Sequence, residues 1–408
     1  MPGLDIRDPT TFQGPDAPAD DDLSTCVHCG LCLNYCPTFR MTGLESESPR
    51  GRLYLMSSWQ RGDLPFTPEL ARHIDLCLGC RTCEAVCPSG VPYGRIIEGG
   101  RAELERLRPP SAKRWLLRRA LRDVLAHPGR LRVTATLARA TQRLGLDRAL
   151  PPAFRLPPLQ APWRRPRARA SAGPAAQRRV AFLEGCVMPL VYGRAHDASI
   201  KLLRLAGCEV VFPADQRCCG ALNAHNGDLE GARHLRAVNQ AAFGVDGLDA
   251  IVVNSAGCGA HMKDFYKDLG VPVKDLFEYL DEIGLPAPSR PVKVRVAYQD
   301  ACHLAHAQGV KVQPRRLLAS LPQVEIVSLQ HPDICCGGAG LYSSLETAMS
   351  DRILAEKMDD VLETGPAIVV VANPGCQMQL ERGLAARRSK IRVLHLAELL
   401  AQGYPDPD

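Results

Sequence analysis

The second half of the chain alternates short β-branched runs with longer stretches of mixed apolar and polar positions. Six such runs stand out: Val180–Leu183, Glu209–Phe212, Ile251–Val253, Val294–Tyr298, Val324–Leu329 and Ile368–Val371. Runs of this length predict strands, and the stretches between them have the length and periodicity of helices. Strands that alternate with helices predict α/β units whose parallel sheets are covered on both faces.

This pattern occurs twice, with a period near 117 residues. RVAFLEGC ends at Cys186 and VRVAYQDAC at Cys302, and RCCGA is matched by ICCGGA. IVVNSAGC ends at Cys258 and VVVANPGC at Cys376, and VPVKDLFEYL is matched by IRVLHLAELL. Four landmarks in the same order predict an internal duplication. We call the two copies the first and second Cys-Cys-Gly units, with expected bounds of 179–289 and 290–408.

Every cysteine landmark follows a predicted strand. Ligands of open parallel sheets lie at the carboxyl ends of the strands, so the cysteines of each unit are expected to converge. The predicted metal ligands are Cys186, Cys218, Cys219 and Cys258 in one unit and Cys302, Cys335, Cys336 and Cys376 in the other. An iron–sulfur cluster, a zinc ion and buried core thiols all remain open. Cys208 has no counterpart and is expected to be a buried thiol, while His261, Gln379 and His303 are extra ligands, proton carriers or neighbours of the site.

The first hundred residues have a different pattern, with two identically spaced cysteine runs. CVHCGLCLNYCP and CLGCRTCEAVCP, 51 residues apart, both follow C-x2-C-x2-C-x3-C-P. Three cysteines at every third residue wrap one face of a [4Fe–4S] cube, and in two-cluster ferredoxins the fourth ligates the other cluster. The expected ligand sets are Cys26, Cys29, Cys32 and Cys87 for one cluster, and Cys77, Cys80, Cys83 and Cys36 for the other. Residues 21–100 are therefore predicted to form an α-helical, two-cluster ferredoxin-like domain.

Composition supports metal-bound cysteines over disulfides. The chain has 408 residues and 17 cysteines, and it begins with an acidic, Pro-rich stretch in place of a signal peptide. We expect residues 1–20 to be a disordered tail and the protein to be cytoplasmic, in a reducing compartment. No apolar run is long enough to predict a membrane-spanning helix.

The net charge of +6 conceals a strongly basic segment. Residues 101–179 hold 20 Lys and Arg against 4 Asp and Glu, whereas the remainder is net negative. Its first part has helical periodicity through Trp115, Leu121 and Val124, and its second part is a Pro-, Ala- and Arg-rich linker. Residues 101–178 are interpreted as a solvated helical segment and tether, or as a face that touches anionic lipid or an acidic partner. Nucleic acid is not expected, because no binding motif accompanies the charge.

With these motifs, the chain resembles the iron–sulfur subunit of glycolate oxidase from about residue 20 to 402. The markers are the two cysteine runs, ESESPRGRLYLM between them, CPSGVPYGRIIE after them and the paired Cys-Cys-Gly units. Those units are also similar to heterodisulfide reductase and to anaerobic glycerol-3-phosphate dehydrogenase. The heterodisulfide reductase version holds a noncubane cluster with a fifth cysteine, where this chain has His261 and Gln379. A four-cysteine cluster remains possible.

The resemblance implies an electron-transfer subunit without catalytic residues of its own. A flavin-binding partner would oxidise glycolate or a similar 2-hydroxy acid, and electrons would pass to the quinone pool at the inner face of the membrane. No G-x-G-x-x-G opens a helix after a strand, in line with a flavin on another chain. The alternatives are a self-contained reductase acting at the Cys-Cys-Gly pockets, and the equivalent subunit of a lactate or glycerol-3-phosphate dehydrogenase.

Overall fold

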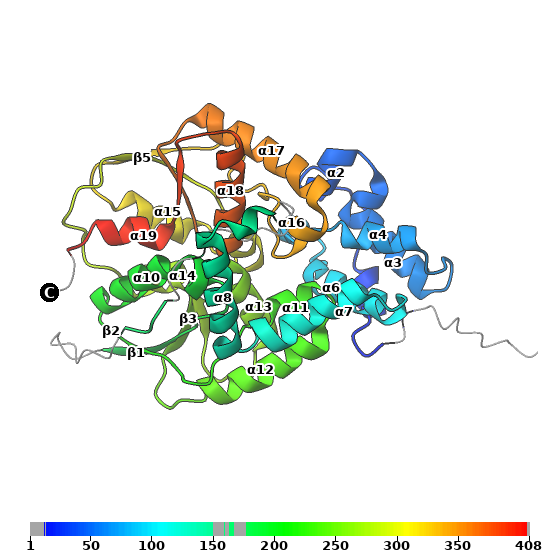
Figure 1. Cartoon of the computed structure of the whole chain (residues 1–408). Coiled ribbons are helices and arrows are strands. Elements are labelled where there is room, and N and C mark those ends of the chain that lie inside the picture. Colours follow the sequence, from blue (N-terminus) through cyan, green and yellow to red (C-terminus); the bar gives the residue numbers. More distant parts are fainter. Residues whose placement is uncertain (1–11, 13, 150–158, 160–162, 167–176, 406–408) are drawn as a thin grey trace, which may run out of the picture.

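The computed structural model describes residues 12, 14–149, 159, 163–166 and 177–405. A helical part at one end of the molecule precedes two α/β units that hold the sheets (Figure 1). Its helices are α1 (Asp20–Ser24), α2 (Pro37–Thr42), η1 (Glu45–Glu47), α3 (Pro49–Gln60), α4 (Pro68–Asp75), α5 (Thr82–Ala85) and α6 (Tyr93–Leu107). Most of the tail predicted for residues 1–20 lies outside the described residues. Its last part packs on the domain, with the Phe12 ring 4.3 Å from Trp59.

The basic segment is helical up to residue 149. It forms α7 (Ala112–Arg119), a π-helical turn η2 (Ala120–Leu125), α8 (Pro128–Arg143) and η3 (Leu146–Ala149). Most of the predicted linker lies outside the described residues. The part around Trp163 is not a free tether, because this side chain is buried and its indole N–H donates to Asp197 at 2.7 Å. The segment is therefore fastened to the first Cys-Cys-Gly unit.

Each Cys-Cys-Gly unit is a four-stranded parallel sheet with helices on both faces. The first comprises β1 (Arg178–Phe182), α9 (Met188–Val191), α10 (Gly193–Leu205), β2 (Cys208–Val211), α11 (Ala221–His225), α12 (Leu229–Phe243), β3 (Ala250–Val253), α13 (Ala256–Phe265), β4 (Val273–Asp275) and α14 (Leu276–Ile283). The second comprises β5 (Val294–Tyr298), η5 (His303–Ala307), α15 (Val312–Ala319), β6 (Val324–Val327), α16 (Tyr342–Leu345), α17 (Thr347–Thr364), β7 (Ile368–Val371), α18 (Pro374–Ala386), β8 (Arg392–His395) and α19 (Leu396–Gln402). The strand orders β2-β1-β3-β4 and β6-β5-β7-β8 are the same, which confirms the predicted duplicated α/β class.

The two units share one hydrophobic core. Val180 and Phe182 of β1 lie in the same buried cluster as Val296 of β5 and Leu400 of α19. Alternate residues of a strand point to opposite faces, so Ala181 faces the other way, into the cluster that contains Cys186 and Cys218. One face of the first sheet thus joins the two units, and the other face supports the cysteines.

The fourth strand of each unit leads into a capped helix that sequence periodicity did not separate from it. Asp275 ends β4 and caps α14 with a capping box, its Oδ1 accepting the Phe277 N–H at 2.9 Å. Asp275 is fully buried, and its Oδ2 has no partner among the described residues. Burial raises the pKa of this carboxyl to about 7.

The pKa of Asp275 makes the first unit less stable as the pH rises. Between about pH 4 and 7 the folded state binds more protons than the unfolded chain, so its stability falls by up to about 1.4 kcal/mol per pH unit. Asp275→Asn keeps the capping acceptor and removes the charge. We expect its thermal unfolding midpoint to exceed that of the wild type at pH 8 and to match it at pH 4. The exposed Asp215→Asn is the control, and a pH profile unchanged by Asp275→Asn would contradict the assignment.

Candidate functional site: four groups of converging cysteines

The first cysteine run forms an exposed loop between α1 and α2. A hollow in this loop is lined by Cys26, Cys29, Cys32, Cys83 and Cys87. The loop curves because His28 and Gly30 both have positive φ, 53° and 85°. Cys83 and Cys87 come from the second run and Cys36 does not line the hollow, so cysteines of both runs lie together here.

Cys36 lies on the side of the second run. Burial raises the pKa of the Cys83 thiol, and neighbouring Cys80, Cys77 and Cys36 raise it further. The Cys36 sulfur is 3.3 Å from Thr38 Oγ1. Cys36 directly precedes Pro37, the first residue of α2. The crossing expected from the spacing stays a prediction, because Cys36 also lies near Cys32 of its own run.

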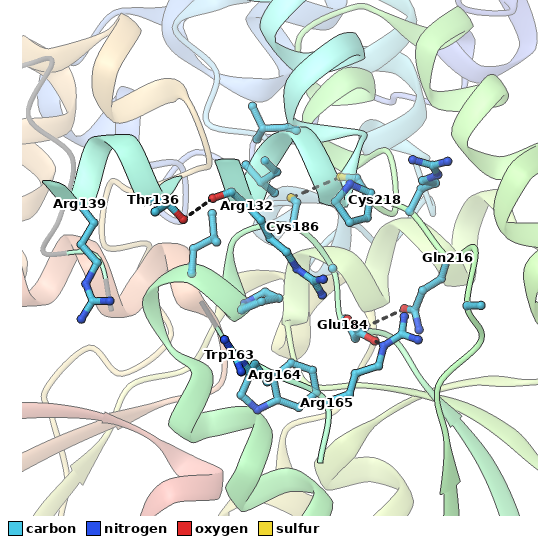
Figure 2. A pocket seen from close by; sticks show the side chains of 18 residues that line it. Arg132, Thr136, Arg139, Trp163, Arg164, Arg165, Glu184, Cys186, Gln216 and Cys218 are labelled. Carbon is cyan, nitrogen blue, oxygen red and sulfur yellow. Dashed lines mark hydrogen bonds and ion pairs between the residues drawn. The ribbon is translucent and has the colours of Figure 1, made fainter. Parts of the chain in front are cut away.

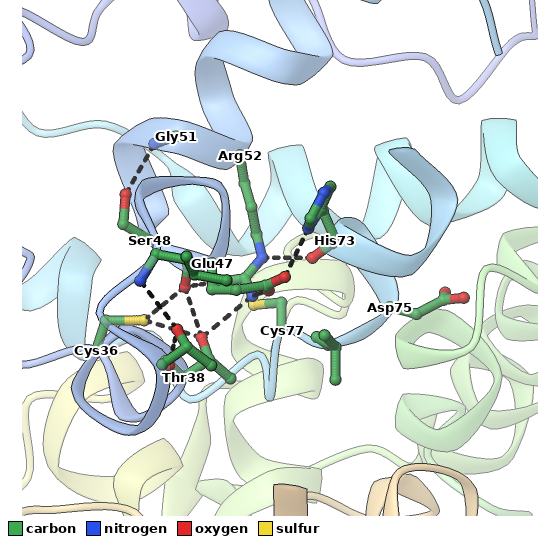
Figure 3. A network of polar contacts seen from close by, with 12 residues as sticks. Cys36, Thr38, Glu47, Ser48, Gly51, Arg52, His73, Asp75 and Cys77 are labelled. Atoms are coloured by element: carbon green, nitrogen blue, oxygen red, sulfur yellow. Dashed lines mark hydrogen bonds and ion pairs between the residues drawn. The ribbon is translucent and has the colours of Figure 1, made fainter. Parts of the chain in front are cut away.

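A buried ion pair lies beside Cys36 and Cys77 (Figure 3). The Arg52 guanidinium donates to Glu47 Oε2 at 2.7 Å and to the Glu47 carbonyl at 2.8 Å. It also donates to Thr38 Oγ1 at 3.1 Å, and His73 Nδ1 lies 2.6 Å from Glu47 Oε1. Arg52 is completely buried. The network therefore joins the loop after the first run to the helix before the second.

In the first Cys-Cys-Gly unit the four predicted cysteines come together from three strand ends. The sulfurs of Cys186, after β1, and Cys218, after β2, are 3.4 Å apart. Contacts with the thiols of Cys218 and Cys258, and burial, raise the pKa of Cys219. Cys258 lies on α13, after β3. Cys208 does not join them, because it lies in β2 and points into the shared core.

The second unit repeats this arrangement. Contact with the Cys335 thiol lowers the pKa of Cys302, and contacts with Cys335 and then Cys376 lower that of Cys336. Asn373 Nδ2 lies 3.6 Å from the Cys376 sulfur. The four thiols form a chain of contacts in the same order as in the first unit.

The second ferredoxin run adjoins the second Cys-Cys-Gly unit. Cys80 shares a buried cluster with Cys302 and Cys335, and burial followed by the nearby Cys302 raises the pKa of Cys80 to about 12. The Tyr342 hydroxyl donates to the Leu76 carbonyl at 3.0 Å across this junction. Two of the cysteine groups are thus in direct contact through the protein interior.

These donors suit iron–sulfur clusters better than single ions. Among the described residues, no three Cys, His, Asp or Glu side chains are close enough together to hold one metal ion. The ligands of a cluster are spread over several irons, so they need not meet at a single point. Buried thiolates this close would repel each other without a cation between them. Each group therefore fits a cluster.

Histidines that the spacing alone did not connect meet where the three domains join. His225 Nδ1 is 2.7 Å from Glu98 Oε1 of α6, and the His225 and His303 rings are 5.4 Å apart. The Nε2 atoms of His261 and His303 are buried without a partner among the described residues. Glu98 and His225 were not predicted, because neither has a spacing relation to a cysteine.

A cavity of about 870 Å³ reaches the first Cys-Cys-Gly group (Figure 2). Cys186 and Cys218 lie on its wall, beside Glu184, whose side chain pairs with Arg165. Most of the remaining lining is basic or apolar and includes Arg132, Arg139, Arg164, Arg165, Arg217, Trp163 and Leu190. The basic segment thus forms one wall of a cavity that ends at two candidate ligands.

The fold and these cysteine groups define an iron–sulfur protein that joins a dicluster domain to two cysteine-rich units. A 4Fe-4S dicluster domain matches residues 22–91, and a cysteine-rich domain matches 180–263 and 296–381. The probable glycolate oxidase iron-sulfur subunit of Bacillus subtilis is 34% identical, over 94% of each chain. The glycolate oxidase iron-sulfur subunit of Escherichia coli is 32% identical, over 94% of this chain and 95% of that one.

The chain belongs to the family of glycolate oxidase iron-sulfur subunits. A hypothetical protein from Helicobacter pylori, of known structure, shares the fold with a TM-score of 0.50 and 11% identity, over 90% of this chain and 70% of that one. The predicted resemblance is confirmed, and with it the iron–sulfur character of the chain. In the part of the chain that the structure describes, no helix combines the length and the hydropathy needed to cross a bilayer.

Proposed function

We propose that this chain carries electrons within a complex that oxidises glycolate or a related 2-hydroxy acid, while a flavin-binding partner removes the hydride. The observation that carries the proposal is the packing of Cys80 against Cys302 and Cys335. Through this contact, the ferredoxin groups and the Cys-Cys-Gly groups form one path for electrons in the proposal. The clusters supply one-electron chemistry when bound, and the chain holds them at fixed separations.

The proposed ligand sets follow the groups described above. They are Cys26, Cys29, Cys32 and Cys87; Cys77, Cys80, Cys83 and Cys36; Cys302, Cys335, Cys336 and Cys376; and Cys186, Cys218, Cys219 and Cys258. The proposed domains remain 21–100, 101–178, 179–289 and 290–408.

The flavin-binding partner docks at the first ferredoxin loop in this proposal. Cys29 is exposed there, and so are the apolar side chains of Val27, Leu31 and Tyr35, at 67%, 57% and 46%. Apolar side chains around an exposed candidate ligand suit a surface that a protein partner covers. Electrons enter here in the proposal and leave toward a quinone at the other end of the route.

We further propose that the protein is cytoplasmic and lies on the inner face of the membrane. Trp115, Leu116, Val133 and Leu137 of α7 and α8 are 61–64% exposed, within the most basic part of the chain. Exposed apolar side chains among arginines have the chemistry of an interfacial helix on anionic lipid. This surface would bring the cavity wall formed by α8 close to a lipid-soluble acceptor.

The arginine-lined cavity also favours a second candidate function. A self-contained reductase would bind an anionic substrate in this cavity, against Cys186 and Cys218. The two functions differ in what the isolated chain can do with a hydroxy acid.

If ligation is crossed, replacing the fourth cysteine of one run removes a ligand from the cluster that the other run holds. We expect Cys36→Ser to damage the cluster held by Cys77, Cys80 and Cys83, and the matched Cys87→Ser to damage the one held by Cys26, Cys29 and Cys32. Each variant of the anaerobically reconstituted chain should lose up to about four of its irons. Spectra of the reduced protein identify the lost cluster through comparison with Cys80→Ser and Cys29→Ser. Loss of the cluster nearer in sequence would contradict the crossing.

The function is tested by turnover with a dye acceptor. We expect the isolated, cluster-loaded chain not to reduce the dye with glycolate, D-lactate or glycerol 3-phosphate, and to do so once the flavin-binding partner is added. The preferred substrate of the restored complex selects among the hydroxy acids. Turnover by the isolated chain would instead support the self-contained reductase.

Membrane attachment is tested by sedimentation with vesicles. We expect the chain to bind vesicles that contain phosphatidylglycerol, and to be released at high salt, because each basic residue near an anionic surface contributes about 1 kcal/mol. Trp115→Ala with Leu116→Ala should weaken binding several-fold, whereas Val312→Ala, an exposed apolar position elsewhere, should not. Equal binding to neutral vesicles, or none, would assign the surface to a protein partner.

A further inference from the structure

His261 lies beside the first Cys-Cys-Gly group on the same helix face as one of its candidate ligands. It follows Cys258 by three residues on α13 (Ala256–Phe265). Residues three apart on a helix are neighbours on one face, so both side chains point toward the same region. His261 is only 4% exposed. A buried imidazole in this position requires a partner for its polar atoms.

The Nε2 atom of His261 has no partner among the described residues, and it points at the Cys-Cys-Gly turn. A Cβ atom added at Gly220 would lie 3.3 Å from this nitrogen. Gly220 directly follows Cys219 and has a positive φ of 94°. The glycine therefore leaves room for the imidazole beside two of the candidate ligands.

The ring is held in this orientation by its neighbours. Phe265 stacks on it with centroids 4.4 Å apart and an interplanar angle of 25°. The Tyr266 hydroxyl donates to the Cys219 carbonyl at 2.8 Å, which ties the same end of α13 to the turn. The nitrogen is thus fixed in place before any metal binds, as a ligand must be.

The second unit lacks this feature at the equivalent position. Gln379 follows Cys376 by three residues on α18, but its amide donates to Ser350 Oγ at 2.9 Å. Ser350 in turn donates to the Gly337 carbonyl at 2.8 Å. The side chain that corresponds to His261 is therefore engaged in supporting the Cys-Cys-Gly turn.

We propose that His261 Nε2 is a protein ligand of the metal centre formed by Cys186, Cys218, Cys219 and Cys258, and that Gln379, at the equivalent position of the second unit, supplies no such ligand. The inference rests on the proposed function, which places an iron–sulfur cluster at this group. Imidazole is an established ligand of iron in clusters that otherwise bind cysteine. The two centres of the duplicated units are then chemically different.

The test uses the full chain, reconstituted anaerobically with 57Fe and labelled with 15N-histidine. We expect hyperfine spectra across a reductive titration to show one strongly coupled histidine nitrogen. His261→Cys supplies another iron ligand, so it should keep the iron and sulfide content and lose the nitrogen coupling. His303→Ala and Gln379→Asn are the matched controls and should keep the coupling. In 57Fe Mössbauer spectra, His261→Cys should change one iron site of the first centre.

The outcomes separate this inference from the proposed function. A nitrogen coupling that persists in His261→Cys, or no coupling in a protein whose iron and sulfide fall on Cys219→Ser, would overturn His261 as a ligand. Iron and sulfide that do not change on Cys219→Ser would show that no cluster is present in the first unit, and would overturn that part of the proposed function. His261→Ala does not distinguish these cases alone, because loss of the ligand and local unfolding both remove the metal.

Discussion

The convergence of buried thiols at the carboxyl ends of parallel strands is the constraint on which the rest of the structure depends. β1, β2 and β3 are each followed by a cysteine landmark, and only a parallel arrangement brings the three strand ends to one edge. The duplicated sheet does the same for the second group. Because both sheet faces must then be covered, the chain needs helices on each side and a core shared between the units.

The ferredoxin part brings its cysteines together without a sheet. A buried ion pair between Arg52 and Glu47 lies at this place instead. Burying Arg52 and Glu47 carries a desolvation penalty of several kcal/mol, which their hydrogen bonds to each other, to Thr38 and to His73 offset. Burial lowers the pKa of Arg52, but nearby Cys77, Tyr93 and Cys36 keep it above its ordinary value. The guanidinium thus remains charged beside two candidate cluster ligands, where a cation stabilises thiolates.

Local pattern and spacing were enough to predict the three strands of each unit and the grouping of cysteines. They missed the fourth strands, because Val273–Asp275 is only three residues long and runs directly into a capped helix. They also missed Glu98, His225 and the packing of Leu76 against Tyr342. Such contacts join residues more than a hundred positions apart, and no periodicity records which surfaces of two domains will meet. The tether predicted around Trp163 failed for the same reason, since its burial depends on His196 and Phe212 of another domain.

In the proposed function, the order of the cysteine groups in space gives the electron flow its direction. The group with an exposed ligand, Cys29, is at the ferredoxin end, and the group on the cavity wall, Cys186 and Cys218, is at the other. Between them, Cys80 meets Cys302, and the Gly257 N–H donates to Asn373 Oδ1 at 3.2 Å, joining the turns that carry Cys258 and Cys376. If both copies of the duplication were equivalent, the two Cys-Cys-Gly groups would not differ, and neither would be marked as the end of the electron path. The arginines of the basic segment line the cavity at the first unit, and Gln379 stands in the second unit where the first has His261, so the two copies have diverged beside their cysteine groups.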